Sequence, residues 1–213
     1  FLWNFNRISY ISDLHLMHRI KNAGCKSKED VVFTIKKIID DILAESTSLT
    51  LIGGDVSSEF SIFELFVKML RKLAGSGRRT FVFVLGNHEL WNFPGLSVDE
   101  IVDKYRTVLK ENGMYLLHND LFYRNESDDM GIIPYDELIQ SDNPAILEKL
   151  RCTRLVILGG LGFSGYNEEF NANDGVYRAT IDRNTEIQES KKFEQLYNKL
   201  MSVLTKKNTI IFT

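Results

Sequence analysis

Cysteine and proline are scarce in this chain of 213 residues, which has two cysteines and three prolines. The cysteines, Cys25 and Cys152, lie far apart and form no Cys-x-x-Cys pair. This predicts reduced thiols in a cytoplasmic protein rather than a disulfide framework. The sequence also has no internal repeat and no linker rich in proline, glycine or serine. We therefore expect one domain over residues 1–213, long enough to bury a large core.

Long apolar runs and an excess of one charge are also missing. No segment approaches the ~18 consecutive apolar residues that a membrane-spanning helix needs. The first residues, FLWNFNR, are too short and too polar for a signal peptide. Because the sequence begins without Met, we expect the natural N-terminus to be processed or removed. The net charge of −3 gives no general attraction to nucleic acid or to anionic membranes.

Short apolar runs alternate along the chain with longer segments of helical period. The runs typical of buried strands are 7–12, 49–52, 80–85, 154–158 and 208–213, and residues 114–123 are expected to form another strand or a hairpin arm. Apolar stripes at a spacing of about 3.6 residues predict helices over 28–45, 60–74, 98–112 and about 185–206. Ser27 is placed to cap the first helix, and Ser97 with Glu100 forms a capping box for the third. The alternation predicts an α/β domain with mainly parallel strands.

Each of the first three predicted strands ends in a polar cluster. The clusters are Asp13-Leu14-His15, Gly53-Gly54-Asp55 and Gly86-Asn87-His88-Glu89. Ligands bind at the carboxyl edge of open α/β sheets, so neighbouring strands would bring these side chains to one place. In an extended chain Asp13 and His15 would point to the same side and reach one ion together. Carboxylate, imidazole and amide ligands suit divalent Mn, Fe or Zn, and the lack of thiolates argues against copper(I) or an iron–sulfur cluster.

With these three clusters in this order, each after a buried strand, the chain resembles the calcineurin-like metallophosphoesterases. The family pattern is Asp-x-His, then Gly-Asp, then Gly-Asn-His followed by Glu or Asp, then a further His, and finally Gly-His-x-His. The resemblance implies a four-layer α/β/β/α sandwich with two divalent metal ions, Mn or Fe, with Zn as an alternative. By the same resemblance, Asp13 and His15 would hold the first metal ion, Asp55 would bridge both ions, and Asn87 would bind the second.

The resemblance also implies the reaction. The implied enzyme is a hydrolase that cleaves a phosphate monoester or diester by attack of a hydroxide bridging two metal ions. His88 would contact the substrate phosphate or protonate the leaving oxygen, and Glu89 would orient His88. The substrate would be a phosphorylated small molecule or a phosphoprotein, nucleic acid is also compatible, and no membrane partner is expected.

The chain departs from the family pattern because the last three family histidines are absent. Its four histidines are His15, His18, His88 and His118. Of these, His18 is expected to face water and His118 to make a structural hydrogen bond. Residues 208–213 resemble the strand that precedes the next family His. We therefore expect the domain to be C-terminally incomplete, with a His soon after Thr213 in the natural protein.

Three segments are expected to form loops that shape a substrate pocket, namely 16–27, 91–97 and 159–180. In the second segment, Trp91 and Phe93 either line the pocket or pack the loop. The third contains a Gly-x-Gly-x-x-Gly sequence that begins at Gly160, but a polar, loop-like stretch follows instead of the helix that a dinucleotide site requires. The sequence therefore disfavours a dinucleotide-binding fold at this segment.

Two other functions fit the same motifs. One is a calcineurin-like binding or scaffolding module without turnover. Scaffolding, however, requires none of the site residues Asp13, His15, Asp55, Asn87 and His88. The other is a nuclease of the same family, which would need a basic groove that the sequence does not show.

Overall fold

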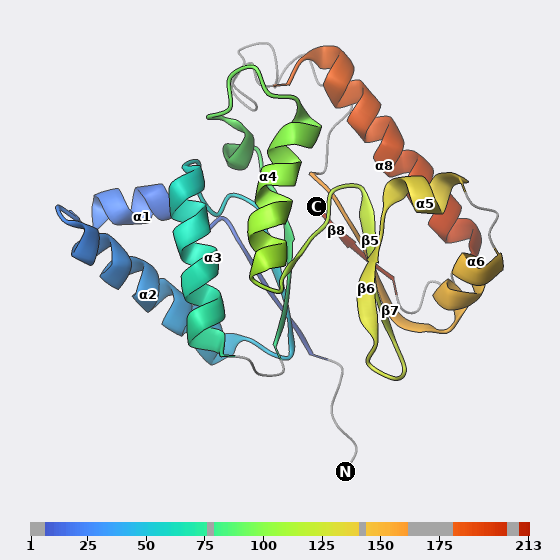
Figure 1. The fold of residues 1–213 in the computed structure, drawn as a ribbon, viewed down its shortest axis with the longest axis horizontal. Coiled ribbons are helices and arrows are strands. Elements are labelled where there is room, and N and C mark those ends of the chain that lie inside the picture. The colour runs from blue at the N-terminus through green and yellow to red at the C-terminus, as the bar shows by residue number, and fades with distance from the viewer. Residues whose placement is uncertain (1–6, 76–78, 141–143, 162–180, 204–208) are drawn as a thin grey trace. The chain divides into compact units, whose positions relative to one another are not determined.

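The structure is a computed structural model that describes residues 7–75, 79–140, 144–161, 181–203 and 209–213 (Figure 1). The chain forms two compact units, which comprise residues 1–116 and 117–213. Both units contain a sheet and helices. The expected α/β class is thus confirmed, and the proposal of one domain across both units stays a prediction.

The first unit is built on a parallel sheet of four strands in the order β1-β2-β3-β4. Its strands are β1 (Ile8–Ser12), β2 (Leu49–Gly53), β3 (Thr80–Val84) and β4 (Tyr115–Leu116). Ser12 pairs with Gly53, and Gly53 pairs with Val84, so the first three strands end level with one another. Strands β2 and β3 are almost entirely buried, as their continuous apolar sequences predict. The polar clusters that follow these strands therefore lie at one edge of the sheet.

The α-helices in the described part of this unit are α1 (Leu16–Asn22), α2 (Lys28–Glu45), α3 (Phe60–Ala74) and α4 (Val98–Glu111). Helix α2 packs against α1 and α3, and α3 also contacts α4 (Figure 1). Complete capping boxes begin two of these helices, with Ser27 and Asp30 at α2 and Ser97 and Glu100 at α4. These boxes satisfy backbone donors at the first turn and so set where each helix starts. The predicted helices and caps are confirmed.

Helix α1 corrects the expectation that residues 16–27 form a loop. Leu16 and Ile20 are its buried residues, and a spacing of four places both on one helical face. The helix is short and its other residues are mostly polar, so its apolar pattern was too weak to predict a helix from the sequence. Packing against α2 stabilises it.

The second unit contains a mixed sheet in the order β6-β5-β7-β8. Its strands are β5 (Asp120–Asn125), β6 (Met130–Ile133), β7 (Thr153–Gly159) and β8 (Thr209–Phe212). Strand β5 is antiparallel to β6 and β7, whereas β7 and β8 are parallel. The expectation of mainly parallel strands thus holds for the first unit and fails in the second, where the two strands β5 and β6 form a hairpin.

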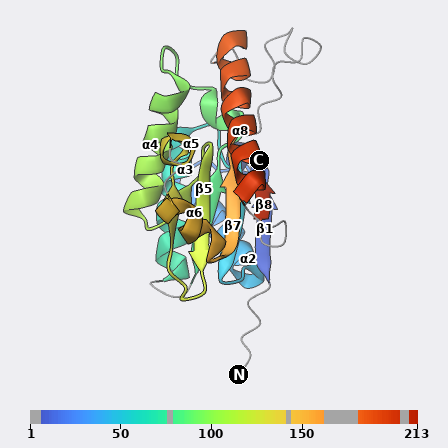
Figure 2. The ribbon, with the colours of Figure 1, turned by 90° about the vertical axis from the view of Figure 1, so that its right-hand side faces the viewer.

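Helices α5 (Tyr135–Gln140), α6 (Pro144–Arg151) and α8 (Arg183–Val203) belong to the second unit. Figures 1 and 2 show α5, α6 and α8 on the same side of this sheet, and both short helices contact α8. The core between these helices and the sheet consists of buried aliphatic and aromatic side chains. Its members include Leu121, Tyr123, Ile133, Leu138, Ile146, Leu150, Val156, Leu158, Leu196 and Leu200.

The stretch 114–123, predicted as one strand or hairpin arm, divides between the two units. Tyr115–Leu116 forms β4 beside β3, and β5 begins at Asp120 in the other sheet. Asn119, directly before β5, has a left-handed backbone with φ 56°. Such a conformation interrupts an extended run. None of the helices in the described ranges combines the length and the apolar character that a membrane crossing requires.

Candidate metal centre

Backbone hydrogen bonds join the loops that follow β1 and β2. The N–H of His15 donates to the carbonyl of Asp55 over 2.8 Å, and the N–H of Leu16 donates to the carbonyl of Val56 over 2.9 Å. A longer bond of 3.3 Å runs from the N–H of Asp13 to the carbonyl of Gly54. The side chains of these loops are thus held near one another by backbone groups, independently of any ligand.

The loops that follow β2 and β3 meet at two glycines. The N–H of Gly54 donates to the carbonyl of Val84 over 3.0 Å. A Cβ on Gly54, which has φ +53°, would lie 2.6 Å from the backbone nitrogen of Gly86. A Cβ on Gly86 would overlap an oxygen of the Asp55 carboxylate. Glycine is required here because the backbones approach more closely than any side chain permits.

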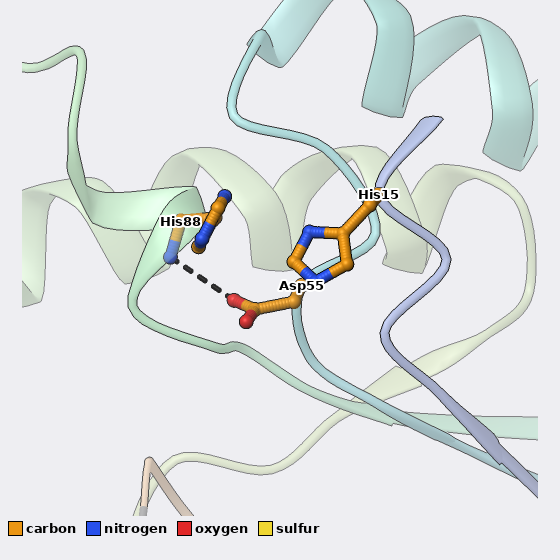
Figure 3. A group of neighbouring side chains, drawn as sticks. All are labelled: His15, Asp55 and His88. Atoms are coloured by element: carbon orange, nitrogen blue, oxygen red, sulfur yellow. Dashed lines mark hydrogen bonds between the residues drawn. The ribbon is translucent and has the colours of Figure 1, made fainter. Parts of the chain in front are cut away.

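His15, Asp55 and His88 form one group of candidate metal ligands, with donor atoms all within 4.8 Å of one another. Figure 3 shows these side chains gathered from three different loops. The centroids of the two imidazole rings are 4.7 Å apart. The backbone N–H of His88 donates to Oδ1 of Asp55 over 3.1 Å. Two imidazoles and one carboxylate, each only partly buried, form a donor set that suits a divalent transition metal.

Asp13 and Asn87 lie beside this group and are not among its three members. An oxygen of the Asp13 carboxylate is 3.7 Å from Nε2 of His15, and the Asp13 side chain is 64% exposed. Asn87 is the residue before the short 3₁₀ helix η1 (His88–Leu90). Its place next to His88 follows from the chain, and its role as a ligand stays a prediction.

Three of the predicted ligands have left-handed backbones, with φ 55° at Asp13, 44° at His15 and 50° at Asp55. The extended backbone expected at Asp13 and His15 is therefore wrong, although the two side chains do approach each other to 3.7 Å. Each left-handed non-glycine residue costs on the order of 1–2 kcal/mol, and such strain persists where the surrounding structure enforces it. Here the bonds between the loops supply that enforcement.

Glu89 was expected to orient His88, but its carboxylate bonds three backbone amides among the described residues. Oε2 accepts from the N–H of Asp55 over 2.9 Å and of Gly86 over 2.8 Å, and Oε1 accepts from the N–H of Ser57 over 2.9 Å. The side chain is fully buried. The pKa of Glu89 is raised to about 7, chiefly by burial and to a smaller degree by the charge of Asp55, and the three backbone hydrogen bonds oppose this rise. No sequence pattern reveals these bonds, because two of the three amides lie more than 30 residues away.

Of the two aromatic residues that follow η1, Trp91 contacts the site and Phe93 packs elsewhere. The Trp91 ring lies over the His88 imidazole, with centroids 3.6 Å apart and an interplanar angle of 30°. Phe93 instead contacts the rings of Phe60 and Tyr105, each at a centroid distance of 6.0 Å. Most of the expected pocket segment 159–180 lies outside the described residues.

The other two histidines lie outside the group. His18 is exposed, and its ring centroid is 6.0 Å from that of His15. His118 belongs to the second unit, where its Nε2 lies 3.2 Å from a carboxylate oxygen of Glu189. His118 is thus not among the candidate metal ligands of the described residues, and the structural hydrogen bond expected for it stays a prediction.

Comparison with known families adds a second, independent finding. The family model for calcineurin-like phosphoesterases matches residues 7–212. The chain belongs to this family. No curated protein matched the sequence. In this calcineurin-like phosphoesterase, the three clusters on which the resemblance rested are those that follow β1, β2 and β3.

The residues of this calcineurin-like phosphoesterase fit the divalent metals that the family implies. At metal–ligand distances of about 2.0–2.2 Å, donors on one ion are separated by about 3–4 Å. The donor atoms of His15 and Asp55, the two members of the group that the family pattern assigns to metal, lie within 4.8 Å of each other, near this range. The acidic Asp13 adds a further oxygen donor next to the group.

Proposed function

We propose that this chain hydrolyses a phosphate ester with two divalent metal ions held by Asp13, His15, Asp55 and Asn87. The observation that carries the proposal is the convergence of His15, Asp55 and His88 from three successive strand ends, with donor atoms within 4.8 Å of one another. Family membership supports the same chemistry. When bound, the metal ions would activate a water molecule and neutralise charge on the phosphoryl oxygens.

The protein residues would contribute pre-organisation. The backbone bonds between the loops hold His15 and Asp55 in place, and the N–H of His88 orients the Asp55 carboxylate. Little reorganisation is then needed when charge develops on the phosphoryl group, which is how fixed polar groups accelerate such reactions.

We assign His88 to the substrate rather than to the metal. Its imidazole is held against Trp91 on one face and lies beside the His15 ring. From there it would contact the phosphate or give a proton to the departing oxygen, as general acids do. The preferred metals are Mn or Fe, with Zn as an alternative, since imidazole and carboxylate ligands accept all three.

The expected substrate is a phosphorylated small molecule or a phosphoprotein. We also infer a cytoplasmic location, which the free thiols Cys25 and Cys152 support.

The test is metal analysis of the full-length protein, combined with hydrolysis of aryl phosphate monoesters and diesters in the presence of Mn²⁺. We expect bound metal and turnover in the wild type. Asp55→Ala should lose both, because it removes the proposed bridging carboxylate. His18→Ala is the matched control and should keep both, because His18 is exposed and outside the ligand group.

Two outcomes would contradict the proposal. Full metal content and rate in Asp55→Ala would exclude the bridging role. A wild-type protein without bound metal and without turnover on either ester would favour a binding or scaffolding module.

A further inference from the structure

Glu89 is a buried acidic residue whose carboxylate accepts hydrogen bonds from backbone amides next to the proposed ligands. It is fully buried, and acidic side chains are rarely found in that state unless they are paired or hydrogen-bonded. Its two carboxylate oxygens are engaged by three backbone N–H groups, at 2.8–2.9 Å. The residue therefore has an unusually specific set of partners for a position in the protein interior.

The three amides belong to two different loops. Asp55 and Ser57 follow β2, whereas Gly86 follows β3. One oxygen, Oε2, accepts from both loops at once, from the N–H of Asp55 and from the N–H of Gly86. Since the loop after β1 is in turn bonded to the carbonyl of Asp55, the carboxylate connects all three loops that carry the proposed ligands.

Glu89 is itself anchored in the core of the first unit. Its backbone carbonyl accepts a hydrogen bond of 2.9 Å from the hydroxyl of Tyr105 on α4. The Tyr105 ring is fully buried and meets Phe63 at a centroid distance of 4.7 Å and Phe60 at 5.1 Å. A residue anchored in this way can hold the neighbouring loops at a defined separation.

We propose that Glu89 is a positioning residue that holds the loops after β2 and β3 together, so that Asp55 faces His15 and His88. It binds neither metal nor substrate itself. This inference rests on the proposed function, because it requires Asp55 to take part in metal binding. Without the Glu89 carboxylate, one buried and two part-buried N–H groups lose their acceptor, and the loops separate to reach water.

A purely structural role would have a different consequence. It would lower the stability of the fold and leave the affinity of the folded protein for metal unchanged. A positioning role weakens metal binding in protein that is still folded, and residues that orient metal ligands typically change the affinity by about 10–100-fold.

The experiment is a titration of the metal-free full-length protein with Mn²⁺ by calorimetry, for the wild type and for Glu89→Gln. The glutamine has the same shape, but its NH₂ group faces an N–H donor where an oxygen had accepted. We expect the Mn²⁺ dissociation constant of Glu89→Gln to rise by about 10–100-fold. We also expect faster hydrogen exchange at the amides of Asp55, Ser57 and Gly86 in the metal-free protein.

Ile39→Ala is the matched control. Ile39 is fully buried in α2, so this variant loses stability without touching the loops, and its Mn²⁺ affinity should equal that of the wild type. If Glu89→Gln does not fold, Glu89→Asp takes its place, because the shorter carboxylate keeps the charge but cannot reach both loops.

The outcomes separate this inference from the function on which it rests. Equal Mn²⁺ affinity in the wild type and the Glu89 variant overturns the positioning role and leaves the proposed function standing. A wild-type protein that binds no Mn²⁺ overturns both. Weakened Mn²⁺ binding in Ile39→Ala, to the same degree as in the Glu89 variant, reduces the effect to general destabilisation and also overturns the positioning role.

Discussion

The backbone N–H of His88 donates to Oδ1 of Asp55 over 3.1 Å (Figure 3). Two residues that are 33 positions apart are thus joined at the centre of the proposed site. Because the donor is a backbone group, the bond does not depend on the imidazole of His88. The orientation of the Asp55 carboxylate and the chemistry of the His88 side chain can therefore be separated by mutation.

His88→Ala should keep bound metal and lose turnover. The variant retains the backbone N–H that holds Asp55, and it removes only the imidazole. We expect kcat to fall by about 10²–10⁴-fold, the range for a general acid or base. Metal content by elemental analysis and kcat for an aryl phosphate ester are the two measurements. Loss of metal from His88→Ala would instead make His88 a metal ligand, as its place in the group with His15 and Asp55 also allows.

Gly86→Ala should damage both the fold and the metal centre. Its Cβ would overlap the Asp55 carboxylate and lie 2.6 Å from the backbone nitrogen of Asp55. Overpacking of this kind lowers the free energy of unfolding by about 1–3 kcal/mol, and here it also displaces a proposed ligand. Urea unfolding and Mn²⁺ titration measure the two effects.

Gly24→Ala is the control for Gly86→Ala. Gly24 has φ +67° but open space around it, so alanine there costs about 1–2 kcal/mol of backbone strain and touches no ligand. Its Mn²⁺ affinity should match the wild type. Equal Mn²⁺ affinity in Gly86→Ala as well would show that the close approach of Gly86 to Asp55 does not matter for the site.

Trp91→Leu should reduce turnover without changing metal affinity. The indole is stacked on the His88 imidazole, and an aromatic pair contributes about 0.5–1.5 kcal/mol. Loss of that contact frees the imidazole to adopt other orientations, so we expect kcat to fall by at most about tenfold. Trp91→Phe, which keeps an aromatic ring, should retain more activity. A leucine variant with unchanged kcat and KM would exclude any role for the stacking.

The second unit should lose stability in acid partly through Glu189. Burial alone would raise the pKa of this carboxyl, but hydrogen bonds and charges from His118 and Lys192 outweigh burial and lower it below the ordinary value of 4.5. A carboxyl group whose pKa is lower in the folded state than in the unfolded state makes its full contribution to the stability of the fold at pH values above the unfolded pKa. That contribution disappears as the pH falls through the folded value.

Glu189→Gln should therefore show a flatter dependence of unfolding free energy on pH, in the range below 4.5. Urea unfolding of wild type and variant at several pH values below neutrality measures the difference. Identical pH profiles would mean that Glu189 does not contribute to the acid sensitivity.

Much of the fold followed from local patterns. The apolar stripes and capping residues of α2 and α4 predicted these helices with their starting residues, because a capping box involves groups only three residues apart. The short helix α1 and the division of 114–123 between two sheets were not predicted. Both depend on contacts with segments that are distant in the sequence, which no local periodicity records.

The sequence predicted which residues belong to the candidate site, but it did not predict how they are arranged. Motif order identified His15, Asp55 and His88, which the structure brings together. The left-handed backbones of Asp13, His15 and Asp55 were not foreseen, since only the bonds between neighbouring loops stabilise such conformations.

Residue types and their spacing thus set which strands form and which side chains stand at their ends, because strand and helix propensities act over a few residues. The folded chain alone decided how those ends meet: the contact of Gly54 with Gly86 and the three amides held by Glu89. Those relationships join loops from different parts of the chain, so they exist only once the strands β1, β2 and β3 lie side by side.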